Sequence, residues 1–241
     1  MTDATLAPAN GLRVRNKQDK LRRIKDAAQS LFVANGFDDT TMREIAERAG
    51  VGLGTIFLYA KNKRDLLFLT INEGLENLTN EAEDAVDPKA PLIDNLLAVA
   101  KLHYRFFGRQ AALSRLVLRE MIFYDSGAQA PPFHKTRDRL IRLFGRTIEL
   151  AIANAEIAPS QPPLFAGWTL FCIFQVELRR WLANDVTHLR AGLNELERAF
   201  RMLITGLGAA SDRHARGRAP IPQRRRKATQ SKARDSATPD W

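Results

Sequence analysis

The sequence predicts an all-α protein of about nine helices, and three observations lead to this prediction. Apolar residues recur at spacings of three and four through most of the chain. No alternating apolar run bounded by turn residues indicates a strand. The breaks in the apolar pattern carry Gly, Pro, Asn or Asp, which end helices. Hydrophobic residues make up 45% of the 241 positions, which is enough to build a full core.

The N-terminal quarter predicts a flexible basic arm and then a series of short helices. Residues 1–16 are mixed in composition and are expected to be flexible. A helix is expected from about residue 17 to Asn35, where Asn35-Gly36 ends it. Thr41 and Glu44 form the pattern of a capping box at the start of the next helix. The following expected helices cover about 53–59 and 62–85.

The remaining apolar pattern predicts five longer helices. They are expected at about 92–108, 111–124, 133–156, 163–184 and 188–209. Residues 163–178 are apolar on nearly every helical face, so this segment is expected to pack on its own subunit and on a partner. The last helix carries one long apolar stripe, and these two helices together fit a dimer bundle.

The net charge of +10 is concentrated at the two ends of the chain. Residues 1–65 carry 12 Lys and Arg against 8 Asp and Glu, and residues 211–241 carry 9 against 3. Residues 66–210 are balanced, with 16 of each sign. Basic segments of this kind favour a polyanionic partner such as nucleic acid, although solubility is an alternative explanation.

Residues 42–61 carry the pattern of a helix-turn-helix motif. Ala46 is small where two helices must approach closely, and Gly50 lies in the turn, where a positive φ costs glycine least. Ile45, Val51 and Ile56 supply apolar contacts between the two helices. In such a motif the second helix lies in the major groove of DNA.

With this motif, residues 21–67 resemble the N-terminal domain of the TetR-like transcriptional repressors. The matching residues are Ile24, Ala27, Ala28, Leu31, Phe32, Gly36, Phe37, Thr40, Thr41, Ile45, Ala46, Ala49, Gly50, Val51, Gly54, Thr55, Tyr59, Lys63, Leu66 and Leu67. The resemblance implies an all-helical homodimer with a three-helix DNA-binding head and a helical body that binds a small ligand. It also implies a four-helix dimer bundle and release of a palindromic DNA operator by the ligand.

These expectations divide the chain into four parts. They are a flexible basic arm (1–16), a helix-turn-helix DNA-binding domain (17–62), a ligand-binding and dimerisation domain (63–210) and a disordered basic tail (211–241). A basic arm could lie in the minor groove, or it could be a solvated terminus. The run Arg224–Lys227 in the tail could grip DNA without sequence preference, or it could be a solvated run.

The expected recognition helix, from Gly52 to Tyr59, is unusually apolar for the family. Thr55 is its one obvious reader of base edges, and Leu53 or Leu58 could contact a thymine methyl group. Thr40 and Thr41 can donate to a phosphate at the helix start. The resemblance adds phosphate contacts by Tyr59 and Lys63, although Tyr59 could instead pack between helices. The predicted DNA contacts are Thr40, Thr41, Arg43, Leu53, Gly54, Thr55, Leu58, Tyr59 and Lys63.

The middle helices are rich in aromatic residues, which predicts a pocket for an apolar or aromatic ligand. The expected pocket residues are His103, Tyr104, Phe107, Glu120, Phe123, Trp168, Phe171 and Gln175. Ordinary core packing is the alternative for each aromatic side chain. A bound ligand is expected to move the helix that starts at Asn62 and so change the spacing of the two recognition helices.

Neither an enzyme nor a metal or cofactor site is expected. The four histidines fall on different segments without metal-ligand spacing, and Cys172 lies in an apolar helix, where a buried and inert thiol is expected. No Gly-rich phosphate loop is followed by Lys and Ser or Thr. Two alternatives remain open: a helical ligand- or protein-binding module that does not read DNA, and an activator or a broad-specificity DNA binder.

The chain is also expected to be cytoplasmic and associated with the nucleoid, without contact to a membrane. Its N-terminus lacks the apolar segment of a secretion signal. No apolar stretch approaches the roughly 20 residues that a membrane-spanning helix needs. One cysteine excludes an intramolecular disulfide framework.

Overall fold

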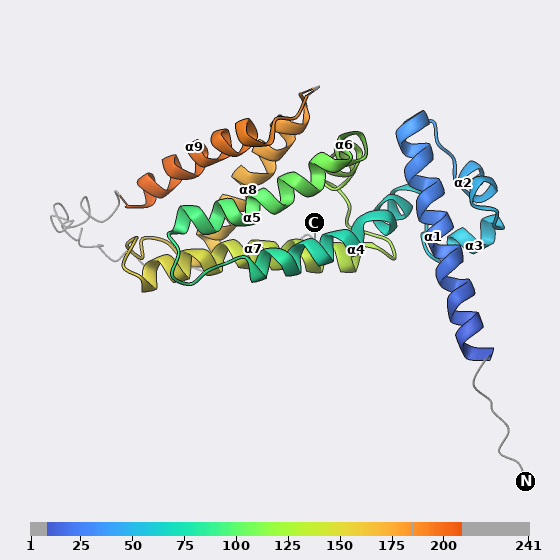
Figure 1. Ribbon diagram of the computed structural model, residues 1–241, viewed down its shortest axis with the longest axis horizontal. Coiled ribbons are helices and arrows are strands. Elements are labelled where there is room, and N and C mark those ends of the chain that lie inside the picture. Colours follow the sequence, from blue (N-terminus) through green and yellow to red (C-terminus); the bar gives the residue numbers. More distant parts are fainter. Residues whose placement is uncertain (1–8, 185, 209–241) are drawn as a thin grey trace, which may run out of the picture.

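The computed structural model describes residues 9–184 and 186–208, and the chain over these residues is all helical (Figure 1). This confirms the predicted fold class. The described helices are α1 (Ala9–Asn35), α2 (Met42–Ala49), α3 (Leu53–Phe57), α4 (Lys63–Asp84), α5 (Leu92–Arg109), α6 (Ala111–Glu120), α7 (Ala130–Ala153), α8 (Pro163–Leu182) and α9 (Leu189–Gly208). None of them combines the length and the apolar character that crossing a membrane requires.

Helices α1 to α3 form a small head, in which α2 packs on α1 and α3 packs on α2 (Figure 1). Its core contains Ile24, Phe32, Ile45 and Ile56, each at most 1% exposed. The capping box of α2 is present as predicted: the Glu44 backbone N–H donates to the Thr41 hydroxyl at 3.2 Å. The turn after α2 is also confirmed, because Gly50 lies in the left-handed region with φ at +61°.

Helix α1 begins earlier than the sequence indicated, at Ala9 rather than near residue 17. The expected flexible arm is therefore helical over residues 9–16. The reason is local: the segment from Leu12 to Asn35 contains no Pro or Gly and is rich in Lys, Arg and Gln, which favour helix. The remainder of the expected arm, residues 1–8, and the expected tail, residues 211–241, lie outside the described residues.

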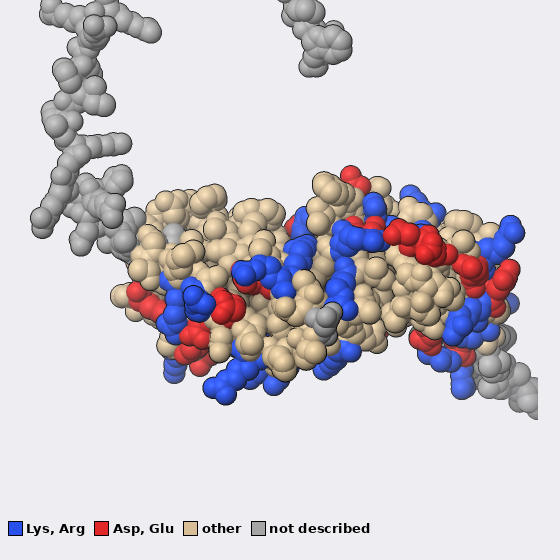
Figure 2. Space-filling model, turned by 90° about the horizontal axis from the view of Figure 1, so that it is seen from above, with Lys and Arg blue, Asp and Glu red and all other residues tan. Residues whose placement is uncertain are grey.

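Helices α4 to α9 form the body, and α4 leads from the head into it (Figure 1). Helix α4 packs on α7, α7 packs on α8, and α9 packs on α5 and α8. Helices α7 and α8 approach each other closely, since a Cβ atom on Gly167 would collide with the backbone nitrogen of Gly145. Over the visible face, Lys and Arg are interspersed with Asp and Glu (Figure 2), in keeping with the charge balance of residues 66–210.

The carboxylate of Asp65, in the first turn of α4, joins three segments of the chain. Its Oδ1 accepts from the Tyr124 hydroxyl at 2.5 Å and from the Gln129 N–H at 2.7 Å. Its Oδ2 accepts from the Lys61 N–H at 2.8 Å and from the Ala128 N–H at 3.0 Å. Asp65 is completely buried. The head-to-body connection and the α6–α7 loop are thereby tied to one side chain.

Two further features fit this arrangement. Gly127 has φ at +134°, and a Cβ atom there would overlap the Asp65 carboxylate, so the loop needs glycine at this point. Burial by itself raises the pKa of Asp65, but the hydrogen bonds from Tyr124 and the three backbone N–H groups outweigh it. The pKa of Asp65 therefore lies below its ordinary value, and the carboxylate stays ionised in the folded chain.

We expect Asp65→Asn to lower the free energy of unfolding at neutral pH by about 3 kcal/mol, because an amide NH₂ would face donors that now bind an oxygen. The difference in unfolding free energy between wild type and variant should shrink as the pH falls below about 4, since a depressed pKa stabilises the fold only while the carboxylate is ionised. Urea unfolding at a series of pH values measures both effects. Asp125, which follows Tyr124 in the chain, is exposed. Asp125→Asn is therefore the control, and equal losses in both variants would contradict this role of Asp65.

Candidate DNA-binding surface and effector cavity

Helix α3 presents an apolar outer face. Leu58 is 81% exposed and Phe57 is 50% exposed, although neither side chain is charged or polar. Gly54 is exposed, with nothing near the place a Cβ would occupy. Thr55 is half-buried, and Leu53 packs partly on the core of the head. Phe57 was not among the predicted contacts, although it lies within the expected recognition helix, from Gly52 to Tyr59, and this was the available signal.

At the start of α2 the two threonines differ. Thr41 is exposed, and Arg43 is exposed beside it. Thr40 is 1% exposed, and its hydroxyl donates to the Gly36 carbonyl at 2.6 Å and to the Leu31 carbonyl at 3.2 Å. The hydroxyl of Thr40 therefore donates to carbonyl groups at the C-terminal end of α1 and is not presented at the surface.

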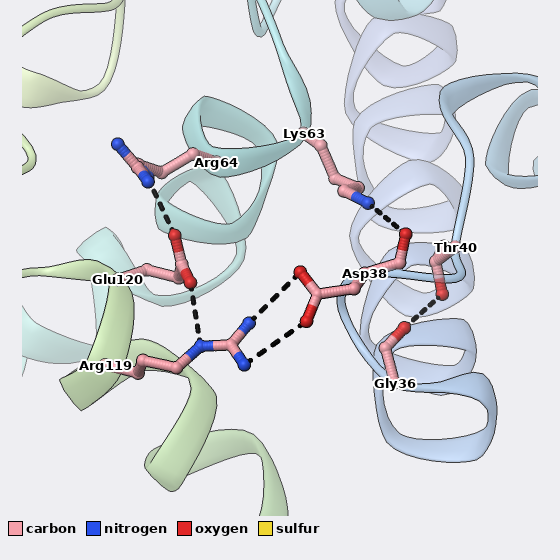
Figure 3. A network of polar contacts seen from close by, with 7 residues as sticks. All are labelled: Gly36, Asp38, Thr40, Lys63, Arg64, Arg119 and Glu120. Atoms are coloured by element: carbon pink, nitrogen blue, oxygen red, sulfur yellow. Dashed lines mark hydrogen bonds and ion pairs between the residues drawn. The ribbon is translucent and has the colours of Figure 1, made fainter.

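The two residues expected to hold phosphates are also placed differently. Tyr59 is half-buried and packs against the core of the head, but its hydroxyl makes no hydrogen bond to another described residue. Lys63 is half-buried, and its Nζ donates to the Asp38 carbonyl at 2.8 Å and lies 4.8 Å from the centre of the Phe37 ring (Figure 3). Its ammonium group is thus held within the head.

A chain of ion pairs links the head to α6 (Figure 3). The Arg119 guanidinium lies 3.4 Å from the Asp38 carboxylate, in the loop between α1 and α2. Glu120 accepts from Arg119 at 2.9 Å and from Arg64, in the first turn of α4, at 2.8 Å. Glu120 is 8% exposed. It was expected in the ligand pocket, but the structure places it at the junction of head and body.

Four of the predicted pocket residues do line one cavity. His103, Phe107, Phe171 and Gln175 surround a space of about 40 Å³ between α4, α5, α6, α7 and α8. Leu75, Thr79, Phe133 and Leu140 complete most of its wall. The cavity is small, and most of the side chains that line it are apolar.

The other four predicted residues lie elsewhere. Glu120 is in the ion-pair chain, and Phe123 is 82% exposed after the end of α6. Trp168 is 47% exposed on the outer side of α8. Tyr104 is fully buried, but its ring packs 4.7 Å from that of Trp181, and its hydroxyl has no partner among the described residues. These residues are corrections to the expected pocket.

The cavity carries one buried histidine, and that histidine is neutral. Burial lowers the pKa of His103 to about 4, and the hydrogen bond to the Val99 carbonyl only partly offsets this. At 2.8 Å from that carbonyl, Nδ1 must carry the proton, so Nε2 is an acceptor. Gln175 accepts from Arg179 at 3.0 Å through Oε1, which leaves its amide nitrogen as a donor.

A second cleft adjoins the cavity and was not predicted. It has a volume of about 250 Å³ and shares Phe107 and Val117 with the cavity. Arg109 and Gln110 line it from the body, and Gln29 of α1 lines it from the head. Gln29 donates to the Thr70 carbonyl of α4 at 3.3 Å. The cleft therefore lies where the head rests on the body.

The outer side of α8 is apolar and exposed. Leu164, Phe165, Trp168 and Val176 are 47–59% exposed, and Cys172 is exposed among them. The expectation that Cys172 is buried is wrong for the single chain. These positions recur every three or four residues, so they form one continuous face, as expected of a helix that packs on two sides.

Comparison with known proteins agrees with this architecture. Residues 24–69 match the model of bacterial regulatory proteins of the tetR family. The fatty acid metabolism regulator protein of Bacillus subtilis is 31% identical over 197 residues, covering 80% of this chain and 98% of the relative. The transcriptional repressor KstR of Rhodococcus jostii is 24% identical, over 78% of this chain and 84% of its own length.

Solved structures share the fold. FadR of Bacillus subtilis in complex with stearoyl-CoA superposes with a TM-score of 0.60, at 24% identity, over 77% of this chain and 98% of its own. FadR of Thermus thermophilus, a repressor in complex with lauroyl-CoA, gives a TM-score of 0.59 at 23% identity, over 84% and 99%. With the full-length similarity to the fatty acid metabolism regulator, these findings identify the family: the chain belongs to the tetR family of bacterial regulatory proteins.

Proposed function

We propose that this regulator is a homodimeric repressor that binds a palindromic operator through α2 and α3 and is released by a long-chain acyl thioester of coenzyme A. The observation that carries the DNA-binding part is the geometry of the head. A capped α2, the left-handed Gly50 and the exposed face of α3 form a helix-turn-helix whose second helix is open to the major groove.

The DNA contacts follow from which side chains are free. Leu58 and Phe57 offer apolar contact to thymine methyl groups, and Arg43 offers a charged contact to a phosphate or a base edge. The Tyr59 hydroxyl and the N–H groups at the start of α2 suit phosphates. Thr40 and Lys63 support these contacts indirectly, because they fix the loop between α1 and α2.

The acyl part of the effector is supported by the cavity and by the relatives. Most of the cavity wall is apolar, with Arg137 as its one cation, its histidine is neutral, and the Gln175 amide nitrogen remains as a donor for a carbonyl. The relative named for fatty acid metabolism and the two acyl-CoA complexes favour an acyl chain over an aromatic ligand. The cavity is too small for a long chain as it stands, so binding requires Phe107 or Val117 to move and to join the cavity with the cleft beside it.

Release of DNA would then follow from the junction of head and body. Enlarging the cavity displaces α4 and α6, which carry Arg64 and Glu120 of the ion-pair chain. The head would be re-oriented through Arg119 and Asp38. A ligand shifts this equilibrium only as far as it prefers the enlarged state over the DNA-binding state.

The dimer is supported by the outer face of α8. An apolar face of this extent is normally covered, and the covering element proposed here is the same helix and α9 of a second protomer. Two recognition helices bound to neighbouring turns of the major groove stand about 34 Å apart. The dimer therefore sets the spacing of the operator half-sites.

We expect Tyr59→Phe to weaken binding to operator and to scrambled DNA alike, by about fivefold, because it removes one hydroxyl contact to a phosphate. Fluorescence anisotropy at fixed salt measures both affinities. Tyr104→Phe removes a buried hydroxyl in the body that has no described partner and should leave both unchanged. A loss restricted to the operator would contradict the phosphate assignment.

Leu58→Ala should have the opposite pattern. It should lower affinity for the operator by about fivefold and leave affinity for scrambled DNA unchanged, because a methyl contact is specific to a base. Leu58 is 81% exposed, so the thermal stability of the free protein should not change. Val33→Ala, another exposed apolar residue of the head, is the matched control. A loss on both DNAs would indicate that Leu58 does not read sequence.

Saturating lauroyl-CoA or stearoyl-CoA should raise the melting temperature by several degrees, whereas free coenzyme A should not. Thr136 lines the cavity from α7 and is only half-buried, so Thr136→Trp should block the acyl chain and abolish the shift. Lys135 precedes Thr136 and is exposed, so Lys135→Trp should keep the shift in melting temperature. Equal shifts with free coenzyme A, or an effect of aromatic acids alone, would overturn the acyl assignment.

A further inference from the structure

The N-terminal part of α1 extends beyond the head without packing on any other helix. Residues 13–20 are all exposed, whereas the same helix is buried in the head at Ile24, Ala28 and Phe32. Figure 1 shows this end of α1 continuing past α2 and α3. Isolated helical segments of this length are marginal in water, and no neighbouring helix of the described chain covers residues 13–20.

The stripe of α1 that faces the head core changes its chemistry at this point. Counting toward the N-terminus, the stripe runs through Leu31, Ala28 and Ile24 at helical spacing. It then continues at the same spacing through Lys20, Lys17 and Arg13. Because α2 packs on α1 within the head and α3 packs on α2, and the stripe faces the core of the head, the three cations continue the side of α1 that faces the helix-turn-helix.

These three cations are not neutralised within the part of the chain that the structure describes. No ion pair involves Arg13, Lys17 or Lys20 there. On another side of the helix, Arg22 lies 3.8 Å from Asp19 and 3.8 Å from Asp26. The acidic residues of α1 thus accompany Arg22, and the stripe on the side of the helix-turn-helix is left positive.

We propose that Arg13, Lys17 and Lys20 bind the phosphate backbone of the DNA that flanks the bases covered by α3. The inference rests on the proposed function, because it assumes that α3 meets the duplex. From Ile24 to Arg13 the helix advances about 16 Å, which corresponds to about five base pairs of duplex. The extension would therefore lengthen each half-site contact without adding base readout.

The same charges could attract an anionic membrane, but the composition of the extension favours DNA. A helix that lies in a membrane interface buries an apolar face. Residues 13–20 include one apolar side chain, Val14, which offers no such face. A phosphate backbone requires charge alone, and charge is what the stripe provides.

The test compares two triple variants of the full chain that remove equal charge. The first is R13Q/K17Q/K20Q, and the control is K101Q/R105Q/K135Q, which removes three exposed cations of the body. Glutamine favours helix, and circular dichroism verifies that helix content is kept. The DNA is an operator selected from a random pool, and the measured quantity is the slope of log Kobs against log salt concentration.

We expect the first variant to lose about 0.9 in slope for each phosphate contact, or about five for a dimer, and to keep the ratio of operator to scrambled affinity. The control should keep the wild-type slope. Trimming five base pairs from each end of the operator should weaken wild-type binding and leave the first variant unaffected. An unchanged slope, or an equal loss in the control, would overturn the inference.

Two further outcomes distinguish this inference from the proposed function and from binding to a membrane. If wild-type protein does not distinguish the selected operator from scrambled DNA, the proposed function fails, whereas discrimination with an unchanged slope defeats the inference alone. Binding to vesicles of phosphatidylserine and phosphatidylcholine is measured in parallel. Vesicle binding that the first variant abolishes, together with an unchanged DNA slope, would overturn the DNA assignment in favour of a membrane.

Discussion

The buried carboxylate of Asp65 is the contact on which the placement of the head depends. It accepts from Lys61 at the end of the head and from Ala128 and Gln129 in the α6–α7 loop. Four donors on one ionised group make this joint strong, because each would be left unsatisfied if the carboxylate moved. The ion pairs of Arg119 with Asp38 are half-exposed and add little by comparison. Lys25 of α1 also pairs with Glu73 of α4 at 2.8 Å, and Gln29 donates to the Thr70 carbonyl. Among these contacts the buried Asp65 carboxylate is the firmest, so a change in the body would disturb the exposed ion pairs first.

The parts of the structure that sequence analysis predicted are those determined by neighbouring residues. The capping box of Thr41 and Glu44, the left-handed Gly50 and the Asn62 cap of α4 each need only a few consecutive positions. The fold class followed for the same reason, because helical periodicity is local. The start of α1 was missed because Gly11 and the mixed composition of residues 1–16 suggested an arm, although no Pro or Gly follows between Leu12 and Asn35.

The parts that could not be predicted depend on which face of each helix meets which neighbour. Composition identified Phe123 and Phe171 alike as aromatic pocket residues, but α6 ends at Glu120 and leaves Phe123 exposed. The chemistry of a helix start suggested Thr40 as a DNA contact, and resemblance suggested Lys63, but neither showed that their polar groups already serve the α1–α2 loop. Glu120 pairs with Arg64, 56 residues away along the chain, and no local pattern reveals such a partner.

The apolar outer face of α3 has a thermodynamic consequence. Binding that buries Phe57 and Leu58 against base edges removes apolar surface from water, and this gives a negative heat-capacity change. Contacts of cations with phosphates act instead through the release of counterions. Affinity for the correct sequence would therefore depend on temperature, and affinity for any duplex would depend on ionic strength. A cell that warms at constant salt would change how well this regulator selects its site more than how firmly it holds DNA.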